Sequence, residues 1–297
     1  PYSPLKQGAS TELPDSLPES LKTAIQSFVV VVACRMARGQ ADEHNSMLVN
    51  VAYRVAWIDE IAWLVSEYVK YLLQGVLTGD CLIESTLLDH YAEEFLPKTE
   101  QIKSSLQYDD PIIQKTSAED VRKQLKKALE KIKVYAVHGR TKGVKVPPLD
   151  LNYSEYDSGL SVIAIGGGKL SRGLTLEGLS ISYFLRTTRM YDSLMQMGRW
   201  FGYRRGYADL CRIYTTDQLR KNFKFITMAT EEVRQTFSEL TLLKKRPRDF
   251  QLKVRTNATD AKLLITSPNR MRESWLQSST FGGKTVQTHQ FQLDQSI

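Results

Sequence analysis

The stretch from Val162 to Gly206 constrains the fold of this chain more than any other part of the sequence. It opens with an apolar run, Val162–Ile165, which three glycines follow at once. Such a pattern predicts a buried strand that leads into a tight turn, which a ligand can approach closely because glycine has no Cβ atom. A second apolar segment, Leu179–Leu185, predicts a neighbouring strand.

An arginine cluster follows the second of these strands. The spacing predicts a short helix over Ser193–Phe201 that carries Arg199 at its end, with Arg204 and Arg205 shortly beyond it. A glycine turn after one strand and arginines after the next are typical of a site that holds a nucleotide phosphate from one side. For Arg199 the alternative is a helix-end arginine that donates hydrogen bonds to backbone carbonyls.

The other segments of the chain alternate between helix and strand. Apolar residues at helical spacing predict a helix over Glu19–Gly39, and the run SMLVNVAY predicts a buried strand over Ser46–Tyr53. A helix over Ala56–Leu73 follows, and further strands are expected at Ile132–Gly139 and Asp209–Thr215. Strands that alternate with helices indicate an α/β fold with a mostly parallel sheet.

Three regions are expected along the chain. Residues 1–18 contain four prolines and predict a linker or an extended arm. Residues 19–215 are expected to form the main α/β domain, with a helical insertion at about 74–118, where the periodic pattern weakens. Residues 216–297 are expected to form a C-terminal extension, which begins with a helix and continues with strand-like segments.

Two motifs between Val162 and Gly206 resemble motifs of known ATPases. Ser171-Arg172-Gly173-Leu174 is similar to motif V, and Gln196 through Arg204 is similar to motif VI, of the second RecA-like domain of superfamily 2 helicases. The runs GGGKLSRGLTLEGL and QMGRWFGYRRGY resemble the Z1 domain family more closely still, a family of helicase-associated proteins often labelled endonucleases. The chain departs from the general helicase pattern in the spacing around Gly198-Arg199 and at residue 175, which is Thr where many of those helicases carry Asp.

The resemblance implies a RecA-like three-layer domain, the C-terminal lobe of an ATP-dependent motor that acts on DNA in a restriction-type defence system. It implies that Arg199, with Arg204 or Arg205, completes a site for ATP with Mg. The residues that would couple this site to nucleic acid are Gly167, Gly168, Arg172, Gly173 and Gln196. The implied partners are DNA, an N-terminal RecA-like lobe of the same protein and other subunits of the defence system.

The chain itself shows no P-loop. That loop requires the pattern G-x-x-x-x-G-K-[ST]. Lys169 follows glycines but precedes Leu170, and Gly283-Lys284-Thr285 lacks the earlier glycine because residue 278 is Ser. ATP is therefore expected to bind only together with a P-loop lobe that is absent from these 297 residues.

Positive charge is concentrated in one part of the chain. The net charge is +7, and residues 186–255 hold 16 Lys and Arg against 7 Asp and Glu. A basic region of this kind suits a polyanion such as DNA. The densest part of this basic region consists of Lys244, Lys245, Arg246 and Arg248. These side chains would either contact nucleic-acid phosphates or lie in an exposed, solvated loop.

Other classes of protein are less compatible with the sequence. Three cysteines without C-x-x-C spacing indicate neither a disulfide framework nor a zinc ribbon, and they fit a cytoplasmic protein. The apolar run Phe28–Cys34 is stopped by Arg35, short of the roughly 20 residues of a spanning helix, so no membrane partner is expected.

Two further functions stay open as alternatives. A nuclease of the PD-(D/E)-x-K type needs paired acidic metal ligands, and only Asp260-Ala261-Lys262 has part of that form. No metal site is therefore expected. His138, at the end of a predicted strand, is either a catalytic base or a structural residue. The other alternative is a non-catalytic domain that binds nucleic acid or a partner protein.

Overall fold

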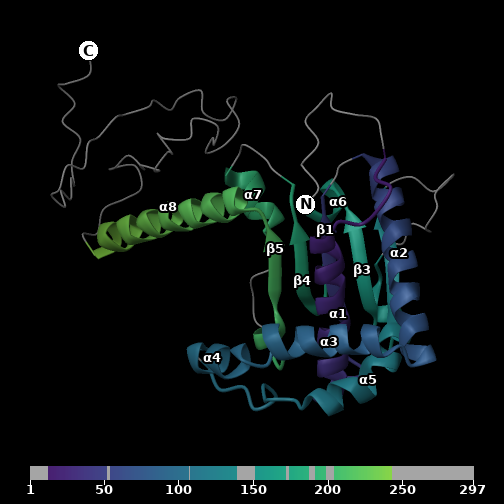
Figure 1. The fold of residues 1–297 in the computed structure, drawn as a ribbon. Helices are drawn as coiled ribbons and strands as arrows, with labels where there is room; N and C mark the ends of the chain where they lie inside the picture. The colour runs from purple at the N-terminus through teal and green to yellow at the C-terminus, as the bar shows by residue number, and fades with distance from the viewer. Residues whose placement is uncertain are drawn as a thin grey trace, which may run out of the picture.

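The structure is a computed structural model that describes residues 13–51, 54–106, 108–138, 151–171, 174–186, 191–198 and 204–242. Within these residues, five strands form one all-parallel sheet in the order β2-β3-β1-β4-β5 (Figure 1). The strands are β1 (Asn45–Asn50), β2 (Ile132–Val137), β3 (Ser161–Gly166), β4 (Leu179–Phe184) and β5 (Arg212–Thr215). The predicted α/β class with a parallel sheet is confirmed.

The three central strands, β1, β3 and β4, are buried at every position. Side chains alternate between the two faces of the sheet, so that Met47 and Val49 join one core cluster and Leu48 joins another. Strands that are covered on both faces read as nearly continuous apolar runs. This is why such runs predicted their positions.

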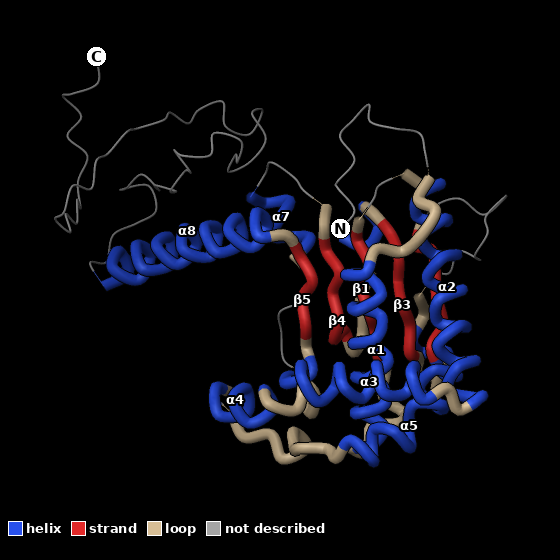
Figure 2. Tube along the Cα trace, viewed as in Figure 1, coloured by secondary structure: helices blue, strands red, loops and turns tan. Residues whose placement is uncertain are grey.

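Three of the longer helices lie on one face of the sheet. They are α1 (Glu19–Ala37), α2 (Val55–Thr78) and α5 (Ala118–Lys131), whose buried residues share a core with Met47 and Ile163. Figure 2 shows α1 in front of the middle of the sheet and α2 beside β3. Between α2 and α5 the chain forms α3 (Cys81–Glu94) and α4 (Lys98–Ser105).

Helix α1 is the most deeply buried of the described helices. Every residue from Phe28 to Cys34 is 0% exposed. Among the described residues, α1 is also long and apolar enough to cross a membrane by length and composition, but 72% of that window is buried inside the fold. Its apolar surface is therefore used by the core of this domain.

Smaller elements cover the opposite face. Tyr153 and Leu160, which precede β3, pack there with Leu170 of the short helix α6 (Gly168–Ser171) and with Leu48 of the sheet. Helices α7 (Tyr191–Met197) and α8 (Asp217–Leu242) form a third cluster around Phe184, and α8 projects outward past β5 (Figure 1). The described chain thus has layers on both sides of the sheet, as the RecA-like prediction required. The domain boundaries at residues 18 and 215 stay a prediction.

Candidate functional site

The carboxyl ends of β1, β3 and β4 meet at one edge of the sheet. The connection from β1 to β2 passes over the face that α2 covers, whereas the connection from β3 to β4 carries Leu170 onto the other face. In open parallel sheets, ligands bind outside the carboxyl ends of strands where the chain turns to opposite faces in this way. We call this region the carboxyl edge.

The glycine turn after β3 lies on the carboxyl edge. At Gly166, a Cβ atom would lie 2.8 Å from the carbonyl oxygen of Val137 and 2.9 Å from Cδ1 of Leu170, so no larger residue fits without a shift. At the exposed Gly168, by contrast, the nearest atom to such a Cβ is Nη1 of Arg186, at 4.0 Å. The turn is packed at its first glycine and open at its third, where backbone can approach a ligand.

Arg186 extends from the end of β4 to the same turn. Its side chain is half-buried, and Nη1 is fully buried without a hydrogen-bond partner among the described residues. Burial lowers the pKa of the Arg186 guanidinium below its ordinary value, and no described acidic group counteracts this effect. A cation with this much desolvation is normally paired, because burying an unpaired charge is costly.

Two buried arginines on the other side of the fold, Arg35 and Arg38, donate several hydrogen bonds each. Arg38 donates to both carboxylate oxygens of Asp209, at 2.8 and 2.7 Å. Arg35 donates to Gln40, to the carbonyl of His44 and to Asn45, at 3.0, 2.7 and 2.6 Å. Arg186 differs from both, because its buried Nη1 has no acceptor within the described ranges.

Asn50, the last residue of β1, connects β1 to the residues that follow β4. Its carbonyl oxygen accepts hydrogen bonds from the amides of Leu185 and Arg186, at 3.1 and 3.3 Å. Its side chain is 1% exposed, and Oδ1 has no hydrogen-bond partner among the described residues. Ser182 Oγ and Thr215 Oγ1, in β4 and β5, are likewise buried and unpartnered in the described part of the chain. Buried polar atoms without a hydrogen-bond partner are uncommon in folded proteins.

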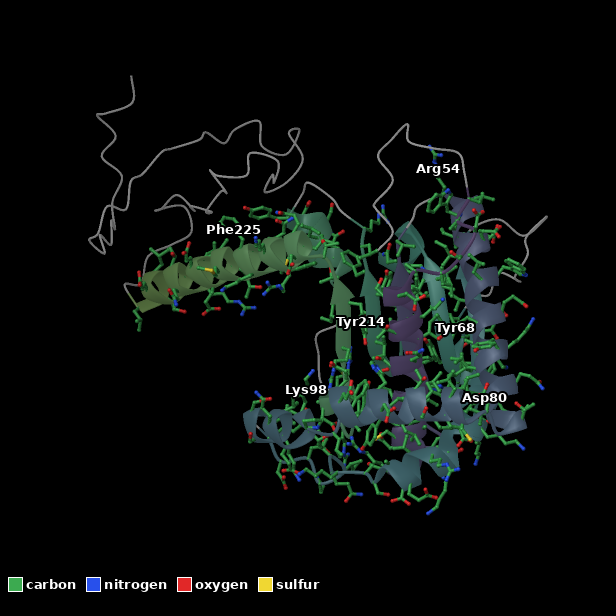
Figure 3. All side chains as sticks on the ribbon, in the orientation of Figure 1. Arg54, Tyr68, Asp80, Lys98, Tyr214 and Phe225 are labelled. Atoms are coloured by element: carbon green, nitrogen blue, oxygen red, sulfur yellow. The ribbon has the colours of Figure 1, made fainter. Side chains whose placement is uncertain are left out.

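Two more polar groups lie at the same end of the molecule. Arg54 directly precedes α2, at the end of the molecule opposite to Asp80 and Lys98 (Figure 3). His138, which follows β2, has its Nε2 atom 2.7 Å from Oδ1 of Asp59 on α2, and its side chain is 4% exposed. The pairing with Asp59 and the burial favour the structural reading of His138, whereas Arg54 adds positive charge to the edge.

The structure brings together some of the predicted site residues. Gly167 is buried within the turn after β3, and Gly168 is exposed beside it. Gln196 is exposed on α7, which contacts α6, so it belongs to the same region. The other predicted residues lie outside the described part of the chain, namely Arg172, Gly173, Arg199, Lys244, Lys245, Arg246 and Arg248.

Arg204 and Arg205 lie at the opposite edge. They precede β5, and a parallel strand begins where its neighbours begin, about 20 Å from the carboxyl edge for strands of six residues. Arg205 lines a pocket of about 370 Å³ there, whose other residues are Arg35, Gln40, Glu43, His44, Ile112, Glu177, Gly178 and Tyr207. The structure therefore does not bring Arg204 and Arg205 together with the glycine turn.

The sequence interpretation did not identify Arg186 or Asn50. The available signal was position: Asn50 ends one buried apolar strand, and Arg186 comes two residues after another. Polar residues at these points reach the carboxyl edge of a parallel sheet. Among the described residues, no group of three or more His, Cys, Asp or Glu could hold a metal ion.

Comparison with known proteins identifies the family. The family model described as the Z1 domain matches residues 20–261 of the chain. No curated protein and no solved structure matches it. The match covers most of the 297 residues, and the chain belongs to the Z1 domain family.

Proposed function

We propose that this chain is the C-terminal motor lobe of a superfamily 2 helicase-like ATPase that acts on DNA, in a restriction-type defence system. The observation that carries the proposal is the placement of the Gly166–Gly168 turn on the carboxyl edge of an all-parallel sheet, beside Arg186, whose Nη1 has no partner among the described residues. An edge of this type, with glycines and a guanidinium, suits the phosphates of a nucleotide. The helicase-like motifs around Arg172 and Arg199 support the same reading.

In this proposal, an N-terminal P-loop lobe binds ATP with Mg, and this chain closes the site from the other side. Arg199 follows α7, which contacts α6 at the carboxyl edge, and would stabilise negative charge on the transferred phosphate. Arg204 and Arg205 are left outside this role, because they lie at the amino ends of the strands. The basic run from Lys244 to Arg248 would contact DNA phosphates.

The test is ATP hydrolysis by the protein that joins this chain to its P-loop lobe, measured with and without duplex DNA. We expect Arg199→Ala to lower kcat by about 10³-fold, the lower range for loss of an arginine finger. Arg220→Ala is the matched control, because Arg220 is exposed on α8 beside Asp217. A scaffold would be unaffected by either substitution, so equal hydrolysis by the wild type and Arg199→Ala would contradict the proposal.

A different measurement distinguishes an endonuclease from the proposed motor lobe. Plasmid DNA is incubated with the chain and Mg²⁺, and nicking is followed over time. We expect no cleavage, because only the segment around Asp260 has part of the required acidic pattern. Nicking that Asp260→Asn abolishes would replace the motor proposal by a nuclease.

A further inference from the structure

Arg186 differs in its hydrogen bonding from the structural arginines Arg35 and Arg38. A structural arginine at this depth would donate to carbonyls or carboxylates, as Arg35 and Arg38 do. Instead, Nη1 of Arg186 is buried without an acceptor among the described residues, although the side chain as a whole is partly exposed. Part of the side chain is thus exposed, while its buried Nη1 has no acceptor in the part of the chain that the structure describes.

The surroundings of Arg186 specify the kind of acceptor. Gly168 is exposed, and Nη1 of Arg186 lies beside it, 4.0 Å from the position that a Cβ atom would take. The amide of Arg186 is held by the carbonyl of Asn50, so the base of the side chain has a defined position. A guanidinium beside open backbone fits an oxyanion with several oxygens, because it can donate two parallel N–H groups while backbone amides approach the same group.

We propose that Arg186 and the turn at Gly168 form an oxyanion subsite for a phosphate group of a polyphosphate ligand. The class of ligand rests on the proposed function, in which that polyphosphate is a nucleoside triphosphate. Asn50 is the positioning residue, because its backbone carbonyl holds the amide of Arg186. Its Oδ1 has no hydrogen-bond partner within the described residues and would accept from a hydroxyl group or a water that accompanies the phosphate.

The first experiment measures binding of inorganic tripolyphosphate to the 297-residue chain by titration calorimetry. We expect Arg186→Met to weaken binding at least tenfold, and Arg186→Lys to weaken it less, since a lysine keeps the charge but loses the planar fork. Arg122→Ala is the charge-matched control, because Arg122 is exposed on α5 and pairs with Glu84. An equal loss in Arg186→Met and Arg122→Ala would show non-specific attraction only, and wild-type affinity in Arg186→Met would overturn the proposal.

The second experiment separates a binding role from a structural one. Without ligand, Arg186→Met should melt at a higher temperature than the wild type, because it removes a desolvated charge whose Nη1 has no partner among the residues that the structure describes. With tripolyphosphate, the wild type should be stabilised and the variant should not. A lower melting temperature for Arg186→Met without ligand would mean that Arg186 is structural.

The two proposals can fail separately. If Arg186→Met loses tripolyphosphate binding while Arg199→Ala keeps full ATP hydrolysis, the subsite stands and the motor function is wrong. If hydrolysis depends on Arg199 but Arg186→Met binds tripolyphosphate normally, the motor function stands and the subsite is wrong.

Discussion

The amide nitrogen of Arg186 donates a hydrogen bond of 3.3 Å to the carbonyl oxygen of Asn50. The residue after β4 is thereby attached to the last residue of β1, the central strand of the sheet. Because β1 is buried on both faces, its end is among the more rigid parts of such a domain. A guanidinium held from this point can face a ligand with little freedom to lose on binding.

The opposite edge is held together by a buried ion pair, for which we predict a large effect on stability. Arg38 and Asp209 are 1% and 0% exposed at their side chains, and Thr99 also donates to Asp209, at 2.9 Å. Asp209→Leu leaves a buried guanidinium without its carboxylate, so the free energy of unfolding in urea should fall by about 3–5 kcal/mol.

Two comparisons check this assignment. Glu84→Gln breaks the exposed pair with Arg122 and should cost no more than about 1 kcal/mol. The double variant Arg38→Met/Asp209→Leu should be more stable than Asp209→Leu alone, because no unpaired charge remains. If Asp209→Leu costs no more than Glu84→Gln, the pair does not anchor the residues before β5.

Gly178 allows the start of β4 to approach β1, and we predict that it tolerates no larger residue. Its φ is +64°, and a Cβ atom there would lie 1.8 Å from the carbonyl oxygen of His44. Gly79 is the matched control, since its φ is +70° but no atom lies within 4 Å of its Cβ position. In urea titrations, Gly79→Ala should cost about 1–2 kcal/mol from backbone strain alone, and Gly178→Ala should cost clearly more. Equal losses would mean that the close approach of the two strands is unimportant.

The sequence predicted the sheet well because its central strands are covered on both faces. A short, continuous apolar run such as Val162–Ile165 is typical of a strand that is covered on both faces. The glycines that follow this run indicated where the strand ends, at the carboxyl edge. Asp209 was predicted to begin a strand, but it lies in a single helical turn, Ala208–Leu210, before β5. There its carboxylate pairs with Arg38, a contact between residues 171 positions apart that local patterns do not reveal.

The placement of Arg204 and Arg205 shows a different limit. The arginine cluster after the second predicted strand suggested one site shared with the glycine turn, but the order along the chain does not say to which edge of the sheet each arginine returns. The sheet topology determines this edge, because residues shortly before a parallel strand lie at its amino end and residues shortly after it lie at its carboxyl end. The same rule assigns Arg186 to the carboxyl edge.

We predict that His90 makes stability depend on pH. Burial lowers the pKa of His90, an effect that nearby Glu94 opposes and Arg212 reinforces. The unfolded chain therefore binds the proton more readily, so the free energy of unfolding should be highest above the ordinary histidine pKa of about 6.5 and fall as the pH drops below it. His90→Gln keeps a partner for Ser27, whose Oγ lies 2.6 Å from His90 Nε2. Between pH 7 and 5 the wild type should lose more stability than this variant, and parallel profiles would exclude His90 as the cause.

The most direct test is to map where inorganic tripolyphosphate touches the chain, by following backbone amide resonances in a titration of the isotope-labelled 297-residue protein. We predict that the largest shifts occur at Gly167, Gly168 and Arg186, on the carboxyl edge. Shifts confined to Glu43, Glu177 and Arg205, which line the pocket at the other edge, would contradict the claim that phosphates bind where the strands end.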